Sequence, residues 1–146
     1  MAYIVALSLV DAEGGRTRTL PEVEVCPEWG LLGDKHAGPG DRQLTILASS
    51  ARTAVSESEE PGLCYARFRE NHLVEGLDPG ELSPGDVLTV GKARLRITTA
   101  TKRCYPECAI DPSQCRIKPH LAFAAVETGG VIRRGDEIRL AQYPYP

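Results

Sequence analysis

The chain has 146 residues, 42% of them hydrophobic, and its 17 Lys and Arg against 20 Asp and Glu give a formal net charge of −3. This length predicts a single domain over residues 1–146, with roughly two-thirds of the unfolded surface buried around one core. The charge provides no general field for nucleic acid or for an anionic membrane, so we expect neither as a partner. Any anion must be bound by a local cluster of cations.

The first apolar segment, AYIVALSLV, is too short to span a bilayer, lacks a basic flank and is followed by Asp11 without a cleavage pattern. We therefore interpret it as a strand rather than as a signal or an anchor, and the expected compartment is the cytoplasm. Five cysteines are an odd number. In a reducing compartment they favour catalysis, metal binding or burial over a disulfide framework.

The chain as a whole predicts a mainly β (α+β) fold. Its 14 Gly and 11 Pro are spread along the sequence, which is typical of short strands joined by tight turns. A serine cap, alanines and an acidic run predict one modest helix over residues 49–59, which ends before Pro61 and Gly62. Apolar alternation predicts strands over residues 3–10, 21–25, 43–47, 72–75, 87–90, 93–99, 121–126 and 137–140.

Two segments resemble one another, SPGDVLTVG at 83–91 and RRGDEIRLA at 133–141. In each, Gly permits a tight turn and Asp can accept a hydrogen bond from the nearby backbone before an alternating strand begins. They predict corners of a barrel, although two unrelated turns built from favoured residues explain the pattern equally well.

A glycine-rich loop, GLLGDKHAGPGDRQLTIL at 30–47, precedes a buried strand, and such loops often display binding groups on a rigid scaffold. A solvated charged turn is the alternative, and the glycines match no nucleotide-binding fingerprint. A second polar stretch, FRENHLVEGLD at 68–78, is either another binding bend or an ordinary one. The candidate binding side chains in these two stretches are Asp34, Lys35, His36, Asp41, Arg42, Arg69 and Asn71.

The segment TKRCYPECAIDPSQC holds three of the five cysteines, spaced C-x3-C-x6-C behind Lys102 and Arg103. A thiolate is the nucleophile and the soft metal ligand, and neighbouring cations favour it, so Cys104 is the first candidate for a reactive thiol. Cys115 is a plausible second thiol that resolves a persulfide or disulfide formed on the first, and Cys108 completes the cluster.

The remaining two cysteines, Cys26 and Cys64, stand alone among apolar neighbours. Free cysteine is among the most buried residue types, so we interpret both as small buried hydrophobes.

Four motifs follow one another in this chain: G-D-K-H-A-G-x-x-x-R-Q-L-T, F-R-E-N-x-x-V-E-G-L-D, L-x-x-G-D-x-L-x-V-G-x-A-x-L, and T-x-x-T-K-R before a cysteine. In this order they resemble the MOSC domain, named after the C-terminal part of molybdenum cofactor sulfurase. The resemblance covers roughly residues 2–141 and is closest to small stand-alone bacterial members with clustered cysteines. It departs from them at Tyr105, where such relatives often have His, and after Cys115.

The resemblance implies a closed or partly open β-barrel with one or two short helices. It also implies an association with the molybdenum cofactor (molybdopterin), a metal held by a phosphorylated pterin, and a sulfur-donor protein as a partner. Cys104 aligns with the family's characteristic cysteine, which implies a persulfide carrier or a molybdenum ligand, with sulfurtransferase-like or cofactor-dependent activity. No pyridoxal phosphate is expected on this chain.

The phosphorylated ligand needs several donors in one place. The resemblance suggests that the three loops meet at one rim of the barrel, as a basic pocket with Cys104 at its floor. Arg42 is our first choice for the phosphate, because a guanidinium matches two phosphate oxygens with parallel hydrogen bonds. The predicted cofactor-binding residues are Lys35, His36, Arg42, Arg69, Asn71, Lys102 and Arg103.

A different class of function uses the same thiols. Cys104, Cys108, Cys115 and His120 lie within 17 residues and could supply four ligands to zinc in a non-catalytic metal-binding or interaction module. Against this, the gaps are irregular and a domain of this size has core enough to fold without a metal. Partial burial without any chemistry is a further alternative.

Overall fold

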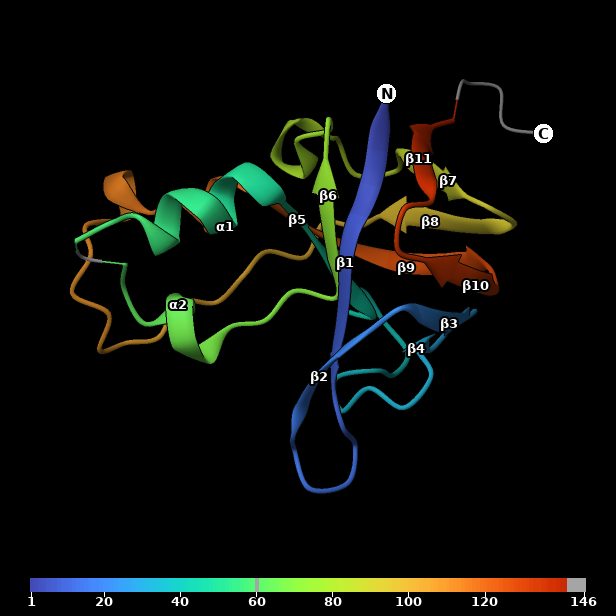
Figure 1. Ribbon diagram of the computed structural model, residues 1–146, viewed down its shortest axis with the longest axis horizontal. Coiled ribbons are helices and arrows are strands. Elements are labelled where there is room, and N and C mark those ends of the chain that lie inside the picture. Colours follow the sequence, from blue (N-terminus) through green and yellow to red (C-terminus); the bar gives the residue numbers. More distant parts are fainter. Residues whose placement is uncertain (60, 142–146) are drawn as a thin grey trace.

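The computed structural model describes residues 1–59 and 61–141, and it is built mainly from strands (Figure 1). The helices are α1 (Ser49–Ser56) and α2 (Cys64–Arg67), with single 3-10 turns η1 (Pro79–Glu81), η2 (Pro112–Gln114) and η3 (Lys118–His120). The strands are β1 (Ala2–Val10), β2 (Thr17–Leu20), β3 (Glu22–Cys26), β4 (Gly30–Leu31), β5 (Leu44–Ala48), β6 (His72–Glu75), β7 (Val87–Val90), β8 (Ala93–Ile97), β9 (Leu121–Thr128), β10 (Gly130–Arg133) and β11 (Glu137–Leu140).

Seven strands close into a barrel in the order β11-β7-β8-β9-β5-β6-β1, because β1 also pairs with β11 through Ala2 and Tyr3. The far half of β1 pairs with β2 instead, and a smaller sheet β10-β3-β4 lies beside the barrel (Figure 1). Adjacent barrel strands are antiparallel except β5 and β6, which are parallel. The expected mainly β fold, a closed or partly open barrel with one or two short helices, is confirmed, and the barrel is closed.

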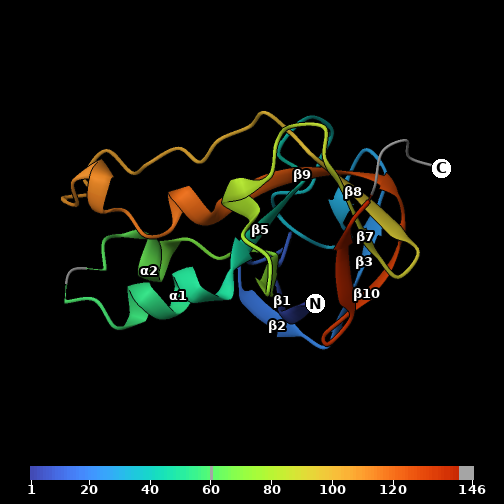
Figure 2. The same cartoon turned by 90° about the horizontal axis from the view of Figure 1, so that it is seen from above.

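The parallel pair explains the helices, because parallel neighbours need a long crossover connection. Residues 49–71 supply it, with α1 and α2 outside the barrel wall. The connection between β8 and β9, residues 98–120, extends over the same side and faces the two helices (Figure 2). No helix within the described residues is both long and apolar enough to cross a bilayer.

Strand β5 is buried along its whole length and separates two apolar clusters. Leu44 and Ile46 belong to the barrel core, whereas Leu47 packs outside the barrel with Val55 and Ile117. Successive side chains of a strand point to opposite faces, so a strand covered on both sides is apolar throughout. The outer cluster fastens the crossover and the cysteine-bearing connection to the barrel wall.

The two Gly-Asp turns lead into neighbouring strands of the barrel, β7 and β11. Gly85 and Gly135 adopt φ values of 96° and 92°, which favour glycine. Asp86 accepts a 2.8 Å hydrogen bond from the Ser83 N–H, and Asp136 accepts one of the same length from the Arg133 N–H. The interpretation as paired corners of a barrel is therefore correct.

The eight predicted strands are all present, with ends shifted by no more than two residues. Strands β2, β4 and β10 and helix α2 were not predicted. Strand β2 is almost wholly exposed and β4 has two residues, so neither carries an apolar period that the sequence could reveal. Helix α1 ends at Ser56 rather than at Glu59.

Candidate functional site: a polar pocket and a thiol pocket

A cavity of ≈ 580 Å³, here called the polar pocket, lies where the loop before β5, the bend before β6 and the start of the cysteine segment meet. It is lined by six of the seven predicted cofactor-binding residues, and the exception is Lys35. The expected convergence of three loops is therefore what the structure shows. The six are His36, Arg42, Arg69, Asn71, Lys102 and Arg103.

Lys102 is the most unusual residue of the polar pocket because its side chain is only 7% exposed. Its ammonium lies 5.1 Å from the ring centre of Phe68 and 4.9 Å from that of Tyr105. Nζ donates one hydrogen bond, of 3.2 Å, to the Arg103 carbonyl. No carboxylate in the described part of the chain forms an ion pair with it. A buried cation without a counter-charge is costly unless an anion completes the site.

Arg42 is exposed at the mouth of the polar pocket, with its guanidinium 4.8 Å from the ring centre of Phe123. Among the described residues it forms no ion pair with Asp34 or Asp41, the alternative that would have made it a plain surface charge. The aromatic face orients the guanidinium without occupying its N–H groups.

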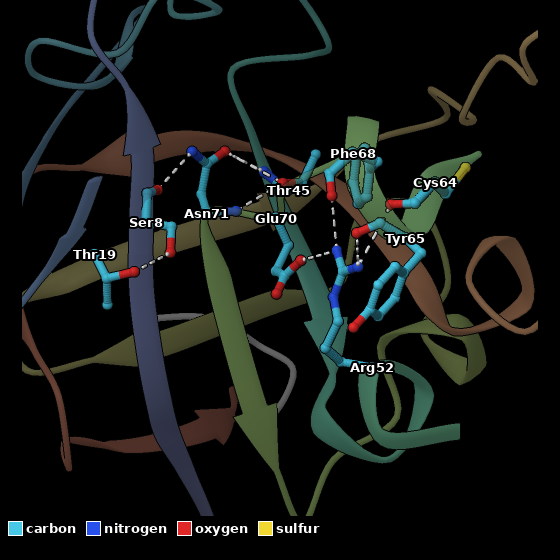
Figure 3. A network of polar contacts seen from close by, with 9 residues as sticks. All are labelled: Ser8, Thr19, Thr45, Arg52, Cys64, Tyr65, Phe68, Glu70 and Asn71. Atoms are coloured by element: carbon cyan, nitrogen blue, oxygen red, sulfur yellow. Dashed lines mark hydrogen bonds and ion pairs between the residues drawn. The ribbon is translucent and has the colours of Figure 1, made fainter. Parts of the chain in front are cut away.

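The amide of Asn71 makes hydrogen bonds within the protein while the residue lines the polar pocket, and its role in ligand binding stays a prediction. Its Oδ1 accepts hydrogen bonds from the N–H and the hydroxyl of Thr45 at 2.9 and 3.2 Å. Its Nδ2 donates to the carbonyl of Ser8 at 3.1 Å. Asn71 is a buried link between β1, β5 and β6, and Figure 3 shows it between Ser8 and Thr45. It shapes the pocket wall through the backbone.

Asp34 is 3% exposed and lines the polar pocket. Its Oδ1 accepts a 3.0 Å hydrogen bond from the Val10 N–H, whereas Oδ2 has no partner among the described residues. A buried acceptor without a donor is uncommon in native structures and calls for an explanation such as a ligand, a water or an ion.

A second cavity of ≈ 190 Å³, here called the thiol pocket, lies between α1, α2 and the cysteine segment. Its wall is otherwise largely apolar, with Val55, Leu63, Ile110 and Ile117. Tyr105 lines both cavities, so the two pockets share this wall. Four cysteines line the thiol pocket, Cys64, Cys104, Cys108 and Cys115.

The structure corrects the expected position of Cys104. Its side chain is exposed and lines the thiol pocket, so it does not form the floor of the polar pocket. All five cysteines are free thiols. The two sequence neighbours of Cys104, Arg103 and Tyr105, line the polar pocket.

Cys108 carries the clearest electrostatic signature of a reactive thiol. Hydrogen bonds from the backbone N–H groups of Leu63 and Ile110 lower its pKa, and the charge of Lys102 adds to this effect. Gly62 lies against this segment with a φ of 77°, and a Cβ there would lie 2.9 Å from the Ile110 Cδ1 and in ordinary contact with the Cys108 Sγ. Lys102, two residues before Cys104 in the sequence, thus also favours the thiolate of Cys108.

Cys26 and Cys64 are half-buried rather than fully buried as expected, and Cys64 packs against the outer apolar cluster. Cys64 begins α2 and lines the thiol pocket, whereas Cys26 ends β3, away from both pockets. Sequence spacing could not have brought Cys64 to the other thiols, because 40 residues separate it from Cys104.

The four-ligand zinc site is not formed. His120 Nδ1 lies 2.9 Å from Asp78 Oδ2 and does not line the thiol pocket. Within residues 1–59 and 61–141, no three His, Cys, Asp or Glu side chains are grouped closely enough to hold a metal ion.

An ion pair holds the walls of both pockets in place. Arg52 of α1 lies 2.6 Å from Glu70, and their side chains are 13% and 4% exposed. Arg52 also donates to the Phe68 carbonyl at 2.8 Å, with longer contacts to the carbonyls of Cys64 and Tyr65 (Figure 3). Cys64 lines the thiol pocket and Phe68 the polar pocket, so one side chain positions both.

Two further pocket residues were not predicted, Arg67 and Tyr105. Arg67 lines the polar pocket, pairs with Glu107 at 2.8 Å and lies 5.3 Å from the Tyr105 ring centre. Tyr105 stands where relatives of this kind often have His, and the sequence assigns it no further role. Neither role has a signal in the sequence, because both depend on the fold of the cysteine segment against α2.

A family model named MOSC domain matches residues 33–139, which include both pockets apart from a few lining residues of β1 and β2. The chain therefore belongs to the MOSC domain family, a family linked to molybdenum cofactor binding. No curated protein matches its sequence.

Solved structures agree with the fold. The YuaD protein from Bacillus subtilis is 18% identical with a TM-score of 0.71, over 97% of this chain and 96% of that one. YiiM from Escherichia coli is 20% identical with a TM-score of 0.66, over 97% of this chain and 70% of that one. YiiM from Geobacillus stearothermophilus is 18% identical with a TM-score of 0.64, over 97% and 76%.

Proposed function

We propose that the polar pocket binds the molybdenum cofactor, or a closely related phosphorylated pterin, and that Cys104 of the adjoining thiol pocket serves as molybdenum ligand or persulfide carrier. The observation that carries the proposal is Lys102, a buried cation that lacks a carboxylate partner among the described residues and lies in a pocket with several arginines. The two aromatic rings and the Arg103 carbonyl stabilise this ammonium in part, and a bound anion would supply the counter-charge.

The residues of the pocket fit both ends of such a ligand. Arg42, Arg69 and Arg103 can donate to phosphate oxygens around the Lys102 ammonium, and guanidinium groups suit phosphate well. The unpartnered Oδ2 of Asp34 suits the N–H groups of an amino-substituted ring. A ligand with an anionic and a hydrogen-donating end therefore satisfies groups that the protein alone leaves unsatisfied.

When bound, molybdenum would supply redox and atom-transfer chemistry, and a cysteine thiolate is a suitable soft ligand for it. The protein's own contribution is to hold the phosphate, to present Cys104 beside the shared wall at Tyr105, and to keep the thiols in a largely apolar cavity.

Binding of a pterin phosphate, followed by the quenching of its fluorescence, tests the anion site. Arg42→Ala should lower affinity by about 1.5–3 kcal/mol, or about 10-fold to 150-fold, the range for a hydrogen bond to a charged group. Arg42→Lys should recover only part of this loss. Unchanged affinity in Arg42→Ala would place the phosphate elsewhere in the pocket.

Lys102→Met gives the sharper test because it removes a charge that no carboxylate balances. Affinity should fall at least as far as in Arg42→Ala, while the free energy of unfolding should stay the same or rise, since no carboxylate is left without a counter-charge. Lys92→Met, at an exposed lysine outside both pockets, is the matched control. A Lys102→Met variant that binds normally but unfolds more easily would show a structural lysine instead.

Metal analysis of protein purified without oxygen addresses the cofactor itself. Molybdenum together with pterin fluorescence supports the proposal, whereas stoichiometric zinc would favour the metal-binding module.

A further inference from the structure

The thiol pocket contains more sulfur than a single ligand or carrier cysteine requires. Four of the five cysteines line one cavity of ≈ 190 Å³. They come from different parts of the chain, since Cys64 begins α2 and the other three lie in the connection between β8 and β9. This convergence is produced by the fold.

The pocket has room for a small molecule. A water molecule takes about 30 Å³ in the liquid, so a cavity of ≈ 190 Å³ can hold a chain of a few heavy atoms. Its wall includes Val55, Leu63, Ile110 and Ile117. An apolar wall suits sulfur chains, which are polarisable and weakly hydrated, better than a strongly hydrated oxyanion.

Within this pocket, Cys108 has the environment of an acceptor thiolate. Cys108 lines the pocket beside Leu63 and Ile110, and hydrogen bonding to their backbone N–H groups lowers the pKa of its thiol. The same donors can hold the terminal sulfur of a persulfide, which is also anionic. Cys104 is exposed on the same pocket, where a later acceptor can reach it.

We propose that Cys108 is the sulfur-accepting residue, which takes a sulfane sulfur from a small polysulfide in the thiol pocket and passes it to Cys104. This inference rests on the proposed function for the role of Cys104, and it names the donor as a small molecule rather than a protein.

The transfer is balanced without an added oxidant or reductant. The Cys108 thiolate attacks the end sulfur of a tetrasulfide dianion, a new S–S bond forms on Cys108, and the old S–S bond breaks with its electron pair leaving on a trisulfide dianion. The Cys104 thiolate then attacks the outer sulfur of the Cys108 persulfide, and Cys108 is released as a thiolate. The sulfane sulfur keeps its oxidation state in both steps.

Sodium tetrasulfide is the probe, applied without oxygen to the full chain and removed before persulfides are tagged by alkylation and located by mass spectrometry. In Cys104→Ser, sulfane sulfur should accumulate on Cys108. In Cys108→Ser, early loading of Cys104 should fall at least five-fold. Cys26→Ser is the matched control outside the pocket and should load as the wild type does.

Two results would overturn the proposal: Cys104 loading at the wild-type rate in Cys108→Ser, or Cys26 loading as fast as Cys108 in the wild type. Pterin phosphate binding is measured on the same samples, so that a variant with an intact polar pocket is known to be folded. If Cys108→Ser loses sulfur transfer but binds pterin phosphate normally, the loss is due to the missing thiol and supports the proposal. Wild-type protein that binds no pterin phosphate would instead refute the proposed function.

Discussion

Replacing Arg52 with methionine should lower the free energy of unfolding by about 3–5 kcal/mol, the range for removing one partner of a buried ion pair. Methionine keeps much of the apolar stem and removes the guanidinium. The Glu70 side chain is only 4% exposed, and its carboxylate then lacks the guanidinium that lay 2.6 Å away. The 2.8 Å hydrogen bond to the Phe68 carbonyl is lost too. The contacts to the Cys64 and Tyr65 carbonyls, at 3.5 and 3.4 Å, are long and add little.

Urea unfolding at pH 7, followed by circular dichroism, measures this change. Arg16→Met, at an exposed arginine, should stay within about 0.5 kcal/mol of the wild type. The double variant Arg52→Met with Glu70→Leu should be less destabilised than the sum of the two single variants, because no buried charge is then left unpaired. A loss below about 1 kcal/mol in Arg52→Met would mean that water solvates Glu70 and that the ion pair does not hold the pocket walls.

Three further predictions concern buried groups. His72 is fully buried, and desolvation lowers its pKa to about 4, which the Thr45 backbone only partly opposes. The unfolded chain, with a pKa near 6.5, therefore takes up a proton first, so stability should fall by up to about 3 kcal/mol between pH 6.5 and 4, as measured by urea unfolding. His72→Leu should remove this dependence, and an unchanged slope would refute the assignment. Asn71→Ala should cost about 2–4 kcal/mol of unfolding free energy, since three side-chain hydrogen bonds are lost; a cost near zero would mean that water replaces the amide. Gly30→Ala should weaken pterin phosphate binding, because Gly30 has a φ of 118° and a Cβ there would collide with the Gln43 carbonyl beside Arg42; unchanged binding would show that the loop yields without moving the pocket.

The barrel was predictable because its strands carry their pattern locally. Strand β7 is apolar at nearly every position and strand β8 alternates, and each pattern matches the burial of its side chains. Gly-Asp turns mark where β7 and β11 begin. The closure of the ring follows from the length of β1, which pairs with different strands along its two halves. No local pattern in the sequence predicts that pairing, and the barrel was expected only from the family resemblance.

The candidate site, too, was predictable only in part. The family resemblance predicted that these polar loops meet at one rim of the barrel, and six of the seven predicted binding residues line the polar pocket. Side-chain roles were not predictable in this way. The sequence predicts Asn71 as a binding residue but not the hydrogen bonds by which its amide joins β1 to β5. Those bonds depend on how the neighbouring strands pack.

The sequence by itself determined eight of the strands, the family and the cationic composition of the site, because these depend on periodicity and on motifs of neighbouring residues. Only the tertiary structure decided which thiol shares a cavity with which. Contact between Cys64 and the cysteine segment requires the crossover from β5 to β6 to fold against the connection between β8 and β9. The burial of Lys102 between two aromatic rings and the backbone donors at Cys108 arise from that same packing, and distances between remote segments are not encoded in any local pattern.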